Sequence, residues 1–310
     1  MTRAETSGLL MAIFCAVVWG ASFPFSAVLA DKMDPVIFAI VRYTLATLGL
    51  AIVFMFTKNR CWLRLKDIPL MAISGIAAQA IFFYTSLLAL KYISASEVGV
   101  INGMIPIFTL LVSIPIYRKI PTTIQFFAVI LSFFGAFCIA FDPSNKFSGL
   151  NIGHLYMLIG VMGFIISCFI NKKFADRYDG LSTMLYQFLF ATIALLLVLP
   201  FGHQSLSQVW IAFGNGYYIF CTLMLGLVCS GLAYVLYFNS LKLAGVNRAN
   251  MVQNLIPLSA FLLSIFMLGE SFTLQKTFGV FLVIVSLFLF DMSWEKIKIK
   301  LRLSSAQAVS

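Results

Sequence analysis

"LADKMD" at residues 29–34 and "FADRYD" at residues 174–179 are short polar segments, each set between long apolar stretches. A shift of 145 residues superimposes them and carries the whole region 8–52 onto the second half of the chain, with identical residues at many small and polar positions. A shift of 151 residues does the same for the region 90–141. The chain is therefore predicted to be an internal duplication, in which the two segments are the same hinge inherited twice.

The composition is that of an integral membrane protein. Of 310 residues, 61% are hydrophobic and only 10% are charged. Apolar runs of about 20 residues, the length at which a helix crosses a ~30 Å hydrocarbon core, recur along the whole chain. We count ten, with approximate limits 7–29, 35–56, 68–89, 94–116, 122–141, 152–171, 182–200, 214–238, 246–268 and 273–292. The runs do not alternate apolar with polar residues, and the loops are short, which argues against a β-barrel and a soluble domain.

The positive charges orient these spans. If the N-terminus is cytoplasmic, sixteen of the 21 basic residues fall in cytoplasmic segments and four in the opposite loops. This bias predicts cytoplasmic N- and C-termini and supports an even number of spans. The net charge of +10 then reflects topology and anionic headgroups, and no nucleic-acid partner is expected. A secretory signal is the alternative for the first run, but that run is long, Pro24 interrupts it, and the duplication requires it.

The odd number of spans in each copy decides the predicted architecture. A five-span copy must be followed by one that starts on the opposite side of the membrane. The predicted fold class is all-α integral membrane, with ten transmembrane helices as two inverted five-helix repeats at residues 1–145 and 146–295, followed by a basic cytoplasmic tail at 296–310. Inverted repeats build alternating-access carriers, so a transporter is favoured.

Polar residues within the spans are candidates for a substrate site. Asn102 lies four residues before Pro106, and Gln253 and Asn254 occupy the same depth before Pro257. A proline within a span frees a backbone carbonyl and kinks the helix, so both prolines are candidate hinges beside a cavity. The alternative is that these amides only join neighbouring helices.

Arg42 lies inside the second span, and the duplication matches it to Gln187. A cation from one half and an amide from the other would suit a substrate that carries a carboxylate or a phosphate. The alternative is a structural role, in which Arg42 caps carbonyls or pairs with Glu97.

Aromatic side chains near these positions could stack against an organic substrate, although each could equally face lipid or the membrane interface. Together with Ser22, which the duplication matches to a second serine, these candidate substrate-binding residues are Trp19, Phe23, Tyr43, Tyr84, Tyr186 and Tyr237.

Motifs for catalysis or metal binding do not appear. The cysteines form no CxxC pair, both histidines are predicted near the outer surface, and there is no HExxH, Walker or GxSxG sequence. No catalytic residue, metal site or cofactor is expected. A membrane-embedded enzyme acting on a lipid or lipid-linked substrate, and a channel or receptor, remain the alternative functions.

Several stretches are similar to one known family. "VVWGASFPFSA" (17–27), "VRYTLATLGLAIV" (41–53), "ALKYISASEVGVINGMIPIFTLL" (89–111) and the region 240–289 resemble the EamA-type carriers of the drug/metabolite transporter superfamily. The chain departs from that pattern at "YRKIPT", where the family often has a Gly-Glu pair, and at Phe164, where it often has a tryptophan.

The resemblance implies a ten-span carrier of the bacterial cell inner membrane. Such carriers move amino acids, related metabolites or drug-like amphiphiles, commonly outward, through a cavity lined by spans one to four and six to nine. The expected partners are a small-molecule metabolite and membrane lipid, and the expected state is a monomer or homodimer.

Overall fold

The computed structural model describes residues 2–30, 32–58, 60–93, 95–141, 150–199, 205–268 and 274–291. Every regular element in these ranges is helical. In chain order the elements are α1 (Arg3–Ala30), α2 (Pro35–Phe56), η1 (Leu65–Asp67), α3 (Ile68–Gly75), η2 (Ile76–Ile81), α4 (Phe82–Ala89), α5 (Ala95–Gly103), α6 (Ile105–Tyr117), α7 (Thr123–Ala140), α8 (Ile152–Phe174), α9 (Gly180–Val198), η4 (Leu206–Phe213), α10 (Gly216–Leu223), η5 (Met224–Leu232), α11 (Ala233–Ala244), α12 (Val246–Val252), α13 (Leu255–Leu268) and α14 (Leu274–Asp291).

The helices are those of a multi-pass membrane protein. Within the described residues, seven helical stretches are long and apolar enough to cross a membrane, and α7 and α14 contribute two shorter apolar helices. The remaining predicted span corresponds to α12 and α13, which are separate elements. The all-helical membrane class is thus confirmed.

The two copies of the hinge cap the helix that follows them. The Asp34 carboxylate accepts the backbone N–H of Val36 at 2.8 Å and so caps α2. The Asp179 carboxylate accepts the backbone N–H of Ser182 at 2.8 Å and caps α9 in the same way. Aspartate is repeated here because it satisfies free N–H groups at a helix start, which stabilises a helix by about 1 kcal/mol.

Two helices in each half of the chain are interrupted. The elements η2 and η5 are π-helical segments, one between α3 and α4 and the other between α10 and α11. Breaks separate α5 from α6 at Met104 and α12 from α13 at Gln253 and Asn254. Both breaks lie just ahead of a proline, Pro106 or Pro257, whose ring cannot follow a regular helical turn because it lacks an N–H and clashes with the preceding carbonyl.

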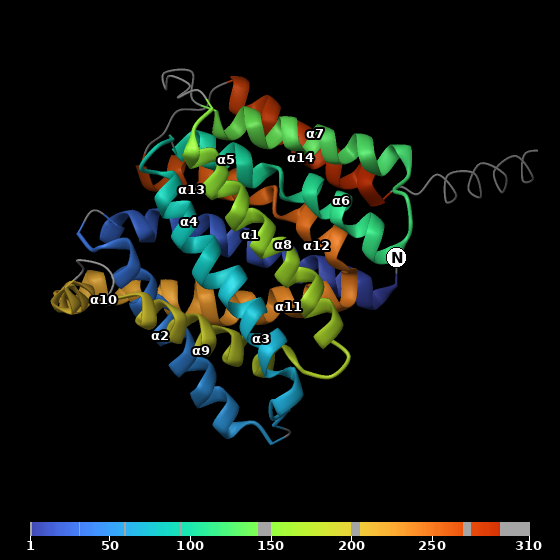
Figure 1. Cartoon of the computed structure of the whole chain (residues 1–310). Helices are drawn as coiled ribbons and strands as arrows, with labels where there is room; N and C mark the ends of the chain where they lie inside the picture. The colour runs from blue at the N-terminus through green and yellow to red at the C-terminus, as the bar shows by residue number, and fades with distance from the viewer. Residues whose placement is uncertain are drawn as a thin grey trace, which may run out of the picture.

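The packing pairs elements across the two halves. Extensive contacts join α1 to α11 and α4 to α8, and these two pairs are equivalent because the duplication matches α1 with α8 and α4 with α11. Extensive contacts also join α2 to α9 and α7 to α14, and each of these pairs consists of two matched helices. Figure 1 shows α7 and α14 along one edge of the molecule, with α2 and α9 toward the opposite edge and α1, α8 and α11 between them. The centre is therefore built by helices from both halves.

Matched glycines bring matched residues together at this centre. A Cβ added to Gly75 would lie 2.5 Å from the carbonyl oxygen of Gln187, and one added to Gly226 would lie 3.2 Å from that of Arg42. Gly75 and Gly226 are related by the shift of 151 residues, and Arg42 and Gln187 by the shift of 145. Each glycine allows α2 or α9 to approach the interrupted helix beside it, and so fixes the position of one candidate residue.

Candidate functional site

A buried network of polar side chains lies where α8, α11, α12 and α6 meet. The Tyr237 hydroxyl donates to Oδ1 of Asn250, and Gln253 Nε2 donates to both the Tyr237 hydroxyl and, at 3.1 Å, Asn250 Oδ1. Asn250 Nδ2 in turn donates to Thr109 Oγ1 at 2.8 Å. All four side chains are buried, so each depends on the others for its hydrogen bonds.

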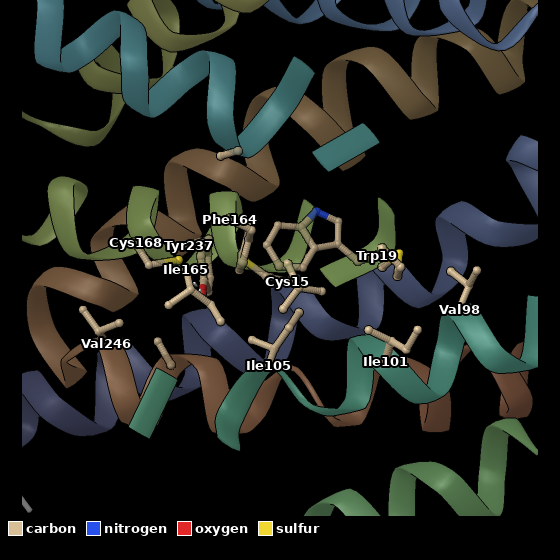
Figure 2. Close-up of a cluster of buried hydrophobic side chains, with 14 of the residues drawn as sticks. Cys15, Trp19, Val98, Ile101, Ile105, Phe164, Ile165, Cys168, Tyr237 and Val246 are labelled. Atoms are coloured by element: carbon tan, nitrogen blue, oxygen red, sulfur yellow. Dashed lines mark hydrogen bonds between the residues drawn. The ribbon is translucent and has the colours of Figure 1, made fainter. Parts of the chain in front are cut away.

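Aromatic rings cover this network on one side. The ring centroid of Trp19 lies 4.9 Å from that of Tyr234 and 5.1 Å from that of Tyr237, and the Phe164 ring stacks on Tyr237 at 6.1 Å. Figure 2 shows Trp19, Phe164, Tyr237 and Cys168 gathered in one cluster. The indole Nε1 of Trp19 donates to the carbonyl of Cys229 at 2.9 Å, a carbonyl that belongs to the π-helical segment η5.

A second polar network joins α3, α8 and α9. Gln187 Nε2 donates to Ser74 Oγ at 3.0 Å and to Asn171 Oδ1 at 2.5 Å, and the Ser74 and Ser167 hydroxyls are 2.7 Å apart. Among the described residues, Oε1 of Gln187 and Oε1 of Gln79 are buried without a hydrogen-bond partner. Two amide oxygens at the centre of the molecule are therefore available to a water or a solute.

A small cavity separates the two networks. Its volume is about 10 Å³, and it is lined by Ala78, Gln79, Phe164, Ser167, Cys168, Asn171, Met184, Tyr234, Tyr237 and Phe238. That space holds about one water molecule, whereas sites for organic ligands measure roughly 300–1,000 Å³. This cavity, as the described residues form it, is therefore too small for an organic solute.

Arg42 reaches the interrupted helix of the second half. Its Nε donates to Ser230 Oγ, in η5, at 2.7 Å, and its side chain is half-buried. Among the described residues no carboxylate forms an ion pair with Arg42, and the Glu97 carboxylate lies 3.5 Å from His154. Within the part of the chain that the structure describes, the guanidinium therefore has a neutral partner, Ser230, and no carboxylate partner.

The remaining candidates divide between the centre and the periphery. Tyr43 lies at the centre, with its hydroxyl 3.5 Å from the Gln79 carbonyl, and Ser22 donates to the Trp19 carbonyl at 2.7 Å. Asn102 is half-buried with an unpartnered Oδ1 among the described residues. The side chain of Phe23 lies outside the described residues.

Three candidates have other surroundings. Asn254 joins helices by donating to Ser132 Oγ at 2.7 Å, and the Tyr186 hydroxyl accepts the backbone N–H of Leu63 at 3.3 Å in the loop before η1. Tyr84 is 39% exposed on α4. None of these three side chains lines the central cavity.

The sequence prediction omitted several polar residues of the centre, among them Gln79, Asn171, Tyr234 and Asn250. Asn250 stands three residues before Gln253 in the same span, one helical turn away, so its spacing alone could have identified it. Gln79 and Tyr234 are single polar residues in apolar stretches, and Asn171 directly precedes Lys172 and Lys173 at the end of its span. Only the rotation of each helix places these three at the cavity.

Two further sets of contacts involve the polar segments 29–34 and 174–179, one segment in each set. We call the first set the Asp67 latch. In it the Asp67 carboxylate accepts a hydrogen bond from the Tyr178 hydroxyl at 2.7 Å and lies 3.4 Å from Arg177 Nη1. Burial raises the pKa of the Tyr178 hydroxyl, and the carboxylate of Asp67 raises it further, so the hydroxyl stays protonated and donates.

We call the second set the Gln208 latch. In it Gln208 Oε1 accepts a hydrogen bond from the backbone N–H of Asp34 at 2.6 Å. Lys32 Nζ donates to the Tyr218 hydroxyl at 2.5 Å beside it. The Asp67 latch joins the segment 174–179 to η1, which precedes α3. The Gln208 latch joins the segment 29–34 to η4, which precedes α10. Each latch thus connects one half of the chain to the start of an interrupted helix of the other half.

Groups suited to metal binding do not occur among the described residues, where no three His, Cys, Asp or Glu side chains come together. The six cysteines are free.

A multi-pass helical protein with buried amide and aromatic side chains at its centre has the character of a membrane transporter. The sequence profile of the EamA-like transporter family matches residues 6–141 and again residues 151–291. The chain belongs to this family, and the predicted relationship to the drug/metabolite transporter superfamily is thus confirmed.

Relatives agree with this assignment, and a solved structure shares the fold. An uncharacterized transporter of Archaeoglobus fulgidus is 24% identical over 87% of this chain and 94% of its own length. The uncharacterized transporter YvbV of Bacillus subtilis is 25% identical over 91% of both chains. The uncharacterized inner membrane transporter YicL of Salmonella typhimurium is 22% identical over 92% of this chain and 95% of its own. A crystal structure with a TM-score of 0.79 and 14% identity covers 93% of this chain and 97% of its own and shares the fold.

Proposed function

We propose that the protein is a secondary transporter that moves small organic solutes across the bacterial inner membrane by alternating access. The observation that carries the proposal is the pairing of equivalent positions across the two halves at a closed polar centre: Arg42 packs against Gly226 as Gln187 packs against Gly75. Two halves with matching contacts can exchange conformations, and so open one central site to either side in turn.

The proposal includes ten spans in two inverted repeats. The π-helical segments and the proline-associated breaks each occur once in each half, as expected if each half is a five-helix unit. The major helix pairs join the two halves through equivalent elements. The double match of the family profile supports the same division. With an odd number of crossings per unit, the two units have opposite orientations in the membrane.

The chemistry of the centre favours an amphiphilic solute with an anionic group, such as an amino acid, and we expect it to be exported. Arg42 supplies a cation that has no carboxylate partner among the described residues, and the amide oxygens of Gln79 and Gln187 are free to accept hydrogen bonds there. Ring faces are supplied by Trp19, Phe164, Tyr234 and Tyr237. Such a site binds a carboxylate at one end, an amine at the amides and an apolar body on the rings.

Proteoliposomes test the function directly. The purified protein would first be screened for thermal stabilisation by amino acids and nucleosides, and the best stabiliser would be used in counterflow. We expect saturable uptake of labelled solute that is stimulated by unlabelled solute on the opposite side. Uptake that rises linearly with concentration, without this stimulation, would indicate a channel.

Topology offers an independent test of the inverted repeat. We expect reporter fusions to place residues 57–67, 171–181 and 293–310 in the cytoplasm and residues 201–213 outside, because the basic residues are concentrated in the former. An external C-terminus would be incompatible with two inverted five-span units.

The prolines should be equivalent points of bending. Pro106→Ala and Pro257→Ala restore a backbone N–H and let α5 join α6, and α12 join α13, in a straighter helix. We expect each change to reduce the transport rate by about tenfold or more, since a hinge that resists bending slows the conformational exchange. Protein yield and melting temperature should change little. Pro115→Ala, in the uninterrupted part of α6, is the matched control. Normal transport by both hinge variants would remove the breaks from the mechanism.

A further inference from the structure

An apolar groove lies on the outer surface of α6 and α7, away from the central cavity. Its volume is about 320 Å³, and it is lined by Ile107, Leu110, Leu111, Ile114, Ile120, Pro121, Thr123, Phe126, Val129 and Ile130. Leu110 and Val129 form a buried floor, whereas Leu111 and Phe126 are about half exposed as walls. The groove is thus a depression between two membrane helices that opens toward the bilayer.

The dimensions of the groove suit a hydrocarbon chain. From Ile107 to Ile114 it follows two turns of α6, about 10 Å at 1.5 Å per residue. Every lining residue except Thr123 is apolar. A lipid tail can fill most of such a depression without desolvating a polar group, because Thr123 is the one lining side chain that can form a hydrogen bond.

One end of the groove carries positive charge at the membrane surface. The candidate span ends at Tyr117, and Arg118 and Lys119 come immediately before the groove residues Ile120 and Pro121. Both basic side chains are exposed. Among the described residues neither forms an ion pair, in contrast to Arg177 and Arg248, which have carboxylate partners.

The backbone at this end is unusual. Arg118 ends α6 with φ +51°, a left-handed conformation that glycine or asparagine normally supplies at a helix end. The chain thus keeps a long cation at a position where a smaller residue would be less strained, which is a feature of functional positions.

We propose that this groove binds an anionic glycerophospholipid, with one acyl chain between α6 and α7 and its phosphate at Arg118 and Lys119. The charge of the two cations is complementary to the headgroup, and the apolar floor is complementary to the tail. The site is independent of the solute-binding centre, since no residue is shared between the groove and the central cavity.

Native mass spectrometry of the purified full-length protein tests the proposal. The protein would be incubated with phosphatidylglycerol or phosphatidylcholine of identical acyl chains, and bound lipid would be measured. We expect phosphatidylglycerol to be retained preferentially. The double variant Arg118→Gln/Lys119→Gln should lose that preference, by about fivefold for each cation removed.

Two further variants separate the groove from general surface charge. Lys58→Gln/Lys66→Gln removes two exposed basic residues of another loop and should leave the preference unchanged. Ile114→Trp fills the groove and should lower retention of phosphatidylglycerol although both cations remain. Melting temperatures in lipid-free detergent would establish that each variant is folded.

Several outcomes would overturn the proposal. These are equal retention of both lipids by the unmodified protein, an equal effect of the control pair, or retention unaffected by Ile114→Trp. A photoreactive residue at Leu111 provides a last check: cross-links to phosphatidylglycerol support the lipid as occupant, and cross-links only to a segment of the chain or to a second copy contradict it.

Discussion

Replacing Arg42 with glutamine should raise the KM for a carboxylate-bearing solute by about 30-fold or more, while the protein still folds. The magnitude follows from removing one partner of a charged contact in a dehydrated site, which costs about 2–5 kcal/mol. The folded state itself loses only the hydrogen bond to Ser230, worth about 1 kcal/mol. Counterflow in proteoliposomes measures the change in KM, and thermal unfolding in detergent measures the loss of stability.

Matched variants make this result specific to charge. Arg42→Lys should recover only part of the affinity, because an ammonium replaces a planar fork with several donors. Ser230→Ala keeps the charge and removes its neutral partner, so the KM should change by a few-fold at most. Solutes without an anionic group should be nearly indifferent to Arg42→Gln. If Arg42→Gln prevents folding, or leaves the affinity for anionic solutes unchanged, the residue is structural.

Asn250→Leu should be the most destabilising single change at the centre and should abolish transport. Leucine has the same branching at Cγ as asparagine but is larger and makes no side-chain hydrogen bonds. It would leave Tyr237, Gln253 and Thr109 without their shared partner. Hydrogen bonds between membrane helices average only about 0.6 kcal/mol each, whereas a buried group left unsatisfied costs about 1–3 kcal/mol. Because three buried hydrogen bonds are lost at once, we expect a loss of about 2–4 kcal/mol in the free energy of unfolding.

Thr109→Val is the matched control for this network, since it removes a single hydroxyl with little change in shape. Its expected cost is about 1 kcal/mol, and transport should persist at a reduced rate. Both variants would be compared by denaturant unfolding in detergent and by counterflow. An Asn250→Leu protein as stable as the unmodified one would show that the network contributes little to folding.

The parts of the fold that depend on local sequence were predictable. Asp34 and Asp179 cap α2 and α9 because an aspartate before an apolar helix satisfies its free N–H groups wherever the helix packs. Pro106 and Pro257 similarly follow breaks in their helices for a reason that lies within a few residues. The all-helical membrane class follows from apolar runs alone.

The site was less predictable because it depends on how each helix is rotated. Asn254 and Gln253 are adjacent in sequence, yet Gln253 joins the central network and Asn254 bonds to Ser132 on α7. Tyr186 and Gln187 are also adjacent, and the tyrosine meets the loop at Leu63 while the glutamine turns inward to Asn171. In a helix successive residues point about 100° apart, and composition does not reveal which of them faces the centre.

The most direct test of alternating access uses the native Cys168 at the central cavity. In a protein that retains only Cys168 and Cys61, a membrane-impermeant thiol reagent would be applied from either side, and labelling of Cys168 would be quantified by mass spectrometry. One end would be held shut by cross-linking Cys61 to Arg177→Cys, since the Cys61 thiol already lies 3.4 Å from the Arg177 carbonyl oxygen. Burial raises the pKa of the Cys61 thiol, so an alkaline pH is needed to form the reactive thiolate.

Holding the Asp67 latch shut should abolish labelling of Cys168 from that side and increase it from the other, because conformations open to the opposite side become more populated. Cross-linking Lys32→Cys to Tyr218→Cys at the Gln208 latch should have the reverse effect. If cross-linking one latch leaves the labelling of Cys168 from the opposite side unchanged, the protein has a fixed pore. If Cys168 is labelled from neither side, the result contradicts a central site.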